Sequence, residues 1–345
     1  MKFRFRSICT LIFLFFSVIT NAQSLPKFSG LMFGDFFYNA SHNNPADKDL
    51  NGFQFRRIYA TADYSINENF NTRFRLEADQ SANSNTPGNK LGVMVKDAWL
   101  QWKNIFNGSH LIFGISPTPA FEIAEGVWEN RFLEKTMLDY WGVVSSRDFG
   151  IDLKGNLQKD GSIKYWLKLG NNSSNAPENN KYKRVYGLIE FHPIQQLTIT
   201  VYGDYASSAK VYDQVEFADK STNSFVASFF AGYKEENFSV GAEGFLRNKQ
   251  NGFRQNNFSA LENLNSHGIS VWSNYRINSD LKIVGRYDLF EPNSNLESDG
   301  NSLILFALDY MPAERIHVSP NVEIKTYEKG GDDDIVPRVT FFWEF

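Results

Sequence analysis

Apolar and polar residues alternate with a period of two through most of the chain. In the stretch 70–80, Phe74 and Leu76 alternate with Arg73, Arg75 and Glu77. Successive side chains of a β-strand point to opposite faces of its sheet. The pattern therefore predicts strands that are apolar on one face and charged on the other.

Sixteen stretches have this strand character, and most of them have the length that a tilted strand needs to cross a bilayer. A soluble β-sandwich also has alternating strands, so the pattern alone leaves open which face points outward. The predicted strands are 27–39, 53–66, 70–80, 92–103, 110–116, 146–157, 162–171, 182–192, 196–206, 224–235, 237–248, 266–277, 280–290, 302–311, 315–327 and 336–345.

The connectors between these strands alternate between long and short. Connectors such as 39–52, 117–145 and 207–223 are long, whereas 67–69 and 278–280 are tight turns. An outer-membrane barrel has short periplasmic turns and longer outer loops, and a Greek-key sandwich gives no reason for this order. The predicted fold is all-β, a transmembrane antiparallel barrel of about 16 strands with both termini in the periplasm.

The last ten residues read Val-Pro-Arg-Val-Thr-Phe-Phe-Trp-Glu-Phe, with Phe341, Trp343 and Phe345 on one face. Aromatic side chains on the outer face of a barrel strand sit well at the headgroup level of a membrane. We expect this strand to close the barrel by pairing with the first one, which removes both sheet edges. The terminal Phe345 is also similar to the C-terminal signal that the outer-membrane assembly machinery recognises.

Residues 1–22 are predicted to be a cleaved signal peptide, which leaves 23–345 as a single domain. Basic residues precede an apolar run, 8–19, that is too short to span a membrane, and the segment ends on Ala22. The lone cysteine, Cys9, lies in this segment, so disulfides and Cys-ligated metals are excluded from the mature chain. Export to the outer membrane of a Gram-negative cell is the predicted location.

The composition agrees with a barrel that has a wet interior. Aromatic residues make up 16% of the chain, yet the mean hydropathy is negative. A formal net charge of −4 argues against a nucleic-acid partner. The five histidines are scattered and form no triad-like motif. We therefore expect no enzyme activity, no cofactor and no metal.

The long connector 117–145 carries more apolar bulk than a solvated loop needs, and 127–140 has spacing compatible with a helix. Long structured loops tend to be functional. Our hypothesis is that this third outer loop folds into the lumen and narrows the pore; the alternative is a surface flap over an edge or a subunit contact. The candidate constriction residues are Glu122, Glu125, Glu129, Arg131, Glu134, Lys135 and Asp139.

Charged residues on the inner faces of the strands form a second candidate set. Arg or Lys on the lipid face costs about 2–4 kcal/mol at mid-membrane, so these side chains are expected to point into water. Opposed acidic and basic residues set an ion preference, although each one taken alone could be an ordinary solvated charge. The candidate wall residues are Arg57, Arg73, Arg75, Glu77, Asp97, Asp148, Asp152, Lys154, Lys164 and Lys168.

Several short segments resemble the porins of the phosphate-selective O and P type. They are Phe-Gln-Phe-Arg-Arg (53–57), Lys-Asp-Ala-Trp-Leu (96–100), Phe-Gly-Ile-Ser-Pro-Thr-Pro (113–119), Ser-Ser-Arg-Asp-Phe-Gly-Ile-Asp-Leu-Lys-Gly (145–155) and the stretch 165–171. The resemblance covers mainly the first half of the chain. It implies a trimeric sixteen-stranded channel whose third outer loop enters the pore. That family's anion selectivity needs a ladder of Arg and Lys, whereas here inward acids are about as numerous as inward cations.

The sequence thus predicts an outer-membrane porin for passive diffusion of small hydrophilic solutes and ions. An anion- or phosphate-selective channel is one alternative, and a structural or adhesion barrel without an open pore is another. The expected partners are outer-membrane lipid, the permeating solutes, the assembly machinery and two further copies of the chain in a homotrimer.

Overall fold

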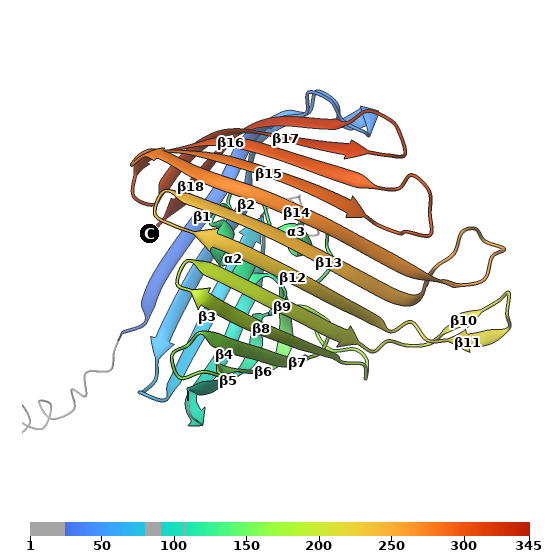
Figure 1. Cartoon of the computed structure of the whole chain (residues 1–345), viewed down its shortest axis with the longest axis horizontal. Helices are drawn as coiled ribbons and strands as arrows, with labels where there is room; N and C mark the ends of the chain where they lie inside the picture. Colours follow the sequence, from blue (N-terminus) through green and yellow to red (C-terminus); the bar gives the residue numbers. More distant parts are fainter. Residues whose placement is uncertain (1–24, 80–90, 107) are drawn as a thin grey trace, which may run out of the picture.

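The computed structural model describes residues 25–79, 91–106 and 108–345. Within these residues, sixteen strands form one closed antiparallel barrel (Figure 1). The predicted all-β barrel of about 16 strands is therefore confirmed. The predicted signal peptide, 1–22, and most of the predicted connector 81–91 lie outside the described residues.

Each predicted strand corresponds to one barrel strand, and the largest differences are at β13 and β14, which extend further into their outer connector. The barrel strands are β1 (Lys27–Tyr38), β2 (Asn51–Ser65), β3 (Phe70–Asp79), β4 (Gly92–Phe106), β5 (Ser109–Pro117), β6 (Arg147–Asn156), β7 (Ile163–Gly170), β8 (Arg184–Ile194), β9 (Leu197–Ala206), β12 (Ser224–Lys234), β13 (Phe238–Phe253), β14 (Glu262–Asn278), β15 (Leu281–Glu291), β16 (Asn301–Ala313), β17 (Ile316–Tyr327) and β18 (Asp334–Glu344).

Short turns and the C terminus lie at one end of the barrel, and the long connectors lie at the other (Figure 1). The long connectors contain a 3-10 helix, η1 (Pro45–Asp47), and a small hairpin of β10 (Val211–Asp213) and β11 (Ala218–Lys220). The hairpin projects beyond the barrel rim (Figure 1). It lies within the predicted connector 207–223, where no regular structure was expected.

The first and last strands join the barrel into a ring. β1 pairs with β18 from Leu31 opposite Glu344 to Phe37 opposite Arg338. Beyond these pairs, Gly30 and Phe345 exchange two backbone hydrogen bonds of 2.9 Å. The predicted closure of the barrel by the terminal strand is therefore seen in its register.

The two faces of the strands differ as the alternation predicts. In β8, Val185 and Ile189 are exposed on the outside, whereas Tyr186 and Glu190 are buried on the inside. In β18, Val339 is exposed and Thr340 is fully buried. Among the described residues, no helix is long and apolar enough to cross a membrane.

The long connector 118–146 lies inside the barrel, where its helices α2 (Glu122–Trp128) and α3 (Met137–Tyr140) are visible in Figure 1. We call this segment the lumen loop. It forms two apolar clusters with the inner faces of β7–β9 and β12–β16. Trp128, Leu133, Met137 and Leu138 are fully buried there. Burying a large apolar side chain contributes about 1.5–3 kcal/mol, so these contacts hold the loop against the wall.

Two glycines on the inner wall make room for the lumen loop. A Cβ atom at Gly232 would lie 2.9 Å from the Cγ1 of Val127, and one at Gly268 would lie 2.2 Å from the Cε of Met137. Both distances are shorter than van der Waals contact. The wall is therefore shaped for this segment, as expected for a loop that is a permanent part of the interior.

The helix-compatible spacing over 127–140 does not produce one continuous helix, because α2 and α3 are separated by irregular backbone. In that gap Arg56 of β2 donates hydrogen bonds to the carbonyl oxygens of Phe132 (2.5 Å) and Leu133 (2.9 Å). In a continuous helix these carbonyls would accept from amides four residues later. A residue distant in sequence thus replaces the helical partners, and local periodicity does not reveal it.

Candidate pore constriction

Two β-bulges turn neighbouring charged residues into the lumen together. The register of β1 and β2 skips Arg56, so that both Arg56 and Arg57 lie on the inner side. The register of β3 and β4 skips Lys96 in the same way, and Lys96 and Asp97 are both buried. A bulge adds one residue to one strand of a pair and shifts the alternation by one. Strict alternation would have placed Arg56 and Lys96 in lipid.

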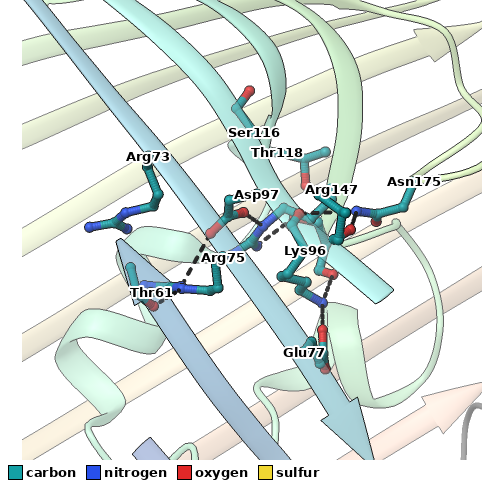
Figure 2. A network of polar contacts seen from close by, with 12 residues as sticks. Thr61, Arg73, Arg75, Glu77, Lys96, Asp97, Ser116, Thr118, Arg147 and Asn175 are labelled. Atoms are coloured by element: carbon teal, nitrogen blue, oxygen red, sulfur yellow. Dashed lines mark hydrogen bonds and ion pairs between the residues drawn. The ribbon is translucent and has the colours of Figure 1, made fainter. Parts of the chain in front are cut away.

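The bulges help to assemble a cluster of four cations from β2, β3, β4 and β6, which we call the basic wall; Figure 2 shows three of them, Arg75, Lys96 and Arg147. Glu77 accepts contacts from Arg57, at 2.7 Å, and from Lys96, at 2.8 Å. Sharing one carboxylate fixes both cations in place. The basic wall consists of Arg57, Arg75, Lys96 and Arg147.

The other half of the basic wall is organised around Asp97. The carboxylate of Asp97 lies 3.3 Å from Arg75 and forms a second ion pair with Arg147. Arg75 also donates a 2.9 Å hydrogen bond to Thr61, which holds its guanidinium in the orientation seen in Figure 2. The side chain of Asp97 is 1% exposed, whereas that of Arg75 is 19% exposed. The carboxylate therefore lies behind the cations, which face the lumen.

On the opposite side, four of the five candidate carboxylates of the lumen loop, all except Glu122, are paired with cations. Arg131 lies 2.9 Å from Glu125 and 3.3 Å from Asp139, and Lys135 lies 3.9 Å from Asp139. Glu129 forms an ion pair with Lys234 at the end of β12. Burial raises the pKa of Glu125, although Arg131 opposes that effect. The acidic face of the loop is thus largely neutralised by its own partners.

Glu134 attaches the lumen loop to the barrel. Its carboxylate lies 3.6 Å from Arg56 and 3.6 Å from Arg338. Burial disfavours the charged form, but Arg56 and Arg338 outweigh burial and lower the pKa of Glu134 to about 2. Arg338 also pairs with Glu323 at 3.0 Å. The loop is therefore held by a network of charges from β2, β17 and β18.

The predicted wall residues of β6 and β7 are mostly engaged in structural contacts. Lys168 and Asp152 form a fully buried ion pair at 3.0 Å. Asp148 accepts 2.8 Å hydrogen bonds from the hydroxyl of Tyr186 and from the backbone amide of Asn172. These residues join strands and outer loops, and they do not line the cavity beside the basic wall.

The remaining predicted residues lie away from the basic wall. Arg73 pairs with Asp63 at 2.7 Å, and Lys164 pairs with Glu190 at 3.0 Å. Lys154 stacks on Trp166, with its Nζ 3.0 Å from the ring centroid. A separate cavity of about 200 Å³ is lined by residues that include Glu122, Lys154 and Lys164.

A cavity of about 380 Å³ lies between the basic wall and the lumen loop. Among the described residues that line it, six are basic and four are acidic. The lining therefore has an excess of two positive charges when His317, which also lines the cavity, is counted as neutral. The basic residues are Arg57, Arg75, Lys96, Arg131, Arg147 and Arg315, and the acidic residues are Glu125, Glu129, Asp139 and Glu344.

Sequence reasoning missed several residues of this site. Arg56 and Lys96 were not among the predicted wall residues, because alternation does not show where a bulge occurs. Arg147 has the same parity as the outward Phe149, yet as the first residue of β6 its side chain reaches Asp97. Arg338 was not among the predicted wall residues either, because its pairing with Glu134 depends on how the loop folds.

The barrel of this chain is similar in fold to those of several solved outer-membrane proteins. It superposes on an anion-selective porin from Comamonas acidovorans with a TM-score of 0.67 and 9% identity, covering 93% of this chain and 99% of that one. It superposes on the outer membrane channel DcaP of Acinetobacter baumannii with a TM-score of 0.66 and 12% identity, covering 94% of this chain and 99% of that one. For the trimer form of in-vitro folded OmpT, an outer membrane protein of Vibrio cholerae, the TM-score is 0.57 and the identity is 13%, over 92% of this chain and 99% of that one. The chain thus has the sixteen-stranded barrel fold of the porins.

No protein-family model matches the sequence. No curated protein matches it either. The resemblance to the phosphate-selective O and P porins is therefore unconfirmed at the level of family and stays a prediction.

Proposed function

We propose that this protein is an outer-membrane porin, a water-filled channel through which small hydrophilic solutes and ions diffuse without catalysis. The observation that carries this proposal is the cavity between the basic wall and the lumen loop. A closed barrel with an apolar exterior is suited to a bilayer, and a charged interior is suited to water. Cleavage of 1–22 and insertion into the outer membrane of a Gram-negative cell are parts of the same proposal.

The charge of the cavity favours a modest preference for anions. Glu77 and Asp97, the carboxylates paired with the basic wall, are 1% exposed and lie behind its cations. The loop acids Glu125, Glu129 and Asp139 that line the cavity have cationic partners of their own. Rings of charged side chains in a pore attract ions of the opposite sign. A ladder of cations along the whole lumen would be needed for phosphate specificity, and the pairing of Lys168 and Lys164 with acids argues against one.

Two partner assignments extend this proposal. A homotrimer is supported by the similarity to the OmpT structure in its trimer form. Recognition by the assembly machinery would use the aromatic C-terminal strand, whose Phe341, Trp343 and Phe345 line the closure seam. A structural or adhesion barrel without an open pore is the competing function.

Purified protein in planar bilayers tests this function directly. We expect discrete ion-conducting steps, and a variant that lacks 127–140 should give larger steps because the segment occupies the lumen. A matched deletion of 211–220, which removes the outer hairpin of β10 and β11, should leave the step size within about 20% of the wild type if the constriction limits the current. A protein that inserts but never conducts would support the structural barrel instead.

A further inference from the structure

The cavity beside the lumen loop has two chemically different sides. On one side are the cations of the basic wall, from β2, β3, β4 and β6. The second side adjoins the first where β1 meets β2, and it consists of the apolar residues Leu31 and Phe33 of β1, Phe132 of the loop and Phe342 of β18. A pore for hydrated inorganic ions gains nothing from an apolar side, because an apolar surface offers no hydrogen bonds to the water that surrounds the ions.

The apolar side is built mainly of aromatic rings. The ring centroids of Phe132 and Phe342 are 5.3 Å apart, and Phe342 lies 5.1 Å from the ring of His317. Ring pairs at such spacings favour tilted or offset contacts with a further ring. A planar apolar group would find more contact area here than a short aliphatic chain would.

The basic side offers planar donors next to this aromatic surface. The guanidinium of Arg57 lies 5.9 Å from the ring centroid of Phe33 and 5.4 Å from that of Tyr59. The guanidinium of Arg75 lies 4.9 Å from the Tyr59 centroid. Guanidinium groups bind carboxylates through paired hydrogen bonds, so one ligand could place its carboxylate here and its ring on the adjoining aromatic surface.

From these two sides we infer that the constriction preferentially binds small organic anions that carry one aromatic ring, of which benzoate is the simplest. The cavity volume of about 380 Å³ is within the range of small-molecule sites. Acetate has the charge without the ring, and phosphate has a strongly hydrated charge that gains nothing from the apolar side. This inference rests on the proposed function, because the ligand must reach the cavity through the channel.

Block of the chloride current through single channels by added solutes tests the inference. Benzoate should reduce the current at a concentration roughly tenfold lower than acetate or phosphate, since its ring makes aromatic contacts that neither of those anions can make. Benzyl alcohol, which has the ring without the charge, should have little effect at the same concentration. Equal block by benzoate and acetate would overturn the inference, and so would equal block by benzoate and benzyl alcohol.

Two variants test whether the aromatic side causes the stronger block by benzoate. Phe342→Leu and, independently, Phe132→Leu should reduce the advantage of benzoate over acetate while leaving acetate block unchanged. Phe258→Leu, in an outer loop and 90% exposed, is the matched control and should retain the full advantage. If both cavity variants keep the wild-type advantage, the aromatic side does not select the ring. Channels that conduct but show no ring preference contradict this inference alone, whereas the lack of any conducting step contradicts the proposed function.

Discussion

At the scale of single residues, the position of the lumen loop depends on Glu134. Its carboxylate lies between Arg56 and Arg338, and Arg56 also binds two loop carbonyls. Removing one member of a buried charge network is costly because the remaining charges lose their partner. A single amide substitution at this position should therefore loosen the loop without removing any apolar contact.

We predict that Glu134→Gln increases amide hydrogen exchange in the irregular segment between α2 and α3 by about tenfold or more, which corresponds to roughly 1.4 kcal/mol. The loss of the two ion pairs is the cause. Glu129→Gln, whose partner Lys234 is at the solvated end of β12, is the control and should change exchange in this segment much less. Equal exchange in Glu134→Gln and the wild type would contradict the anchoring role.

The pH dependence of the same anchor follows from the lowered pKa of Glu134. Its pKa falls from 4.5 to about 2 on folding, so its contribution is complete above the unfolded value and is lost as the pH drops through about 2. Exchange in the loop, corrected for the intrinsic effect of pH, should therefore stay constant from pH 7 down to about 5. Loosening already at pH 5 to 6 would mean that a different group holds the loop.

At the scale of elements, an outer connector stabilises the bulge that forms part of the basic wall. The side-chain amide of Asn175, in the connector between β7 and β8, donates to the carbonyl oxygens of Val95 (2.7 Å) and Lys96 (3.0 Å) (Figure 2). The neighbouring Ser174 contacts Ser145 at the end of the lumen loop, at 2.9 Å. The bulge thus has partners outside its own sheet, and these orient Lys96 toward the lumen.

We predict that Asn175→Ala lowers the anion preference of the channel, because a bulge without its two hydrogen bonds orients Lys96 less well. Each lost bond should cost about 1 kcal/mol. Zero-current potentials in a potassium chloride gradient measure the change. Asn179→Ala, in the same connector, removes only a contact with the neighbouring Asn180 and should keep the wild-type potential. Identical potentials for both variants would show that the bulge does not need Asn175.

The elements also show which parts of this molecule can be predicted from sequence. Alternation predicted the sixteen barrel strands because each strand meets the same two environments along its length. The order of long and short connectors predicted the topology because the turns at one end of the barrel are short and the loops at the other end are long. The bulges at Arg56 and Lys96, the break between α2 and α3, and the position of Arg147 depend on partners far away in the chain. Local patterns carry no signal for such partners, so about half of the basic wall was missed.

At the scale of the whole molecule, the seam between β1 and β18 completes the barrel. Gly34 of β1 lies beside the bulge at Arg56, and a Cβ atom there would be 2.0 Å from the carbonyl oxygen of Gln54 and 2.9 Å from the ring of Phe341. A backbone atom cannot move aside as the end of a side chain can. The seam therefore requires glycine at this position to bring three strands into register.

We predict that Gly34→Ala lowers the temperature at which the folded barrel unfolds in detergent, since overpacking of this kind costs about 1–3 kcal/mol. The shift between the folded and unfolded gel bands on heating measures this temperature. Gly285→Ala is the matched control, because a Cβ atom there would meet no atom within 4 Å. Equal unfolding temperatures for the two variants would show that the seam tolerates a side chain.

In the proposed porin, ions cross the barrel beside the lumen loop, past a wall with an excess of positive charge. The zero-current potential of the purified wild-type protein, in planar bilayers with a tenfold gradient of potassium chloride, tests it most directly. We expect conducting channels whose zero-current potential has the sign of chloride selectivity, and a potential closer to zero in Arg75→Gln. A potential with the sign of potassium selectivity, or membranes that hold the protein without conducting, would contradict it.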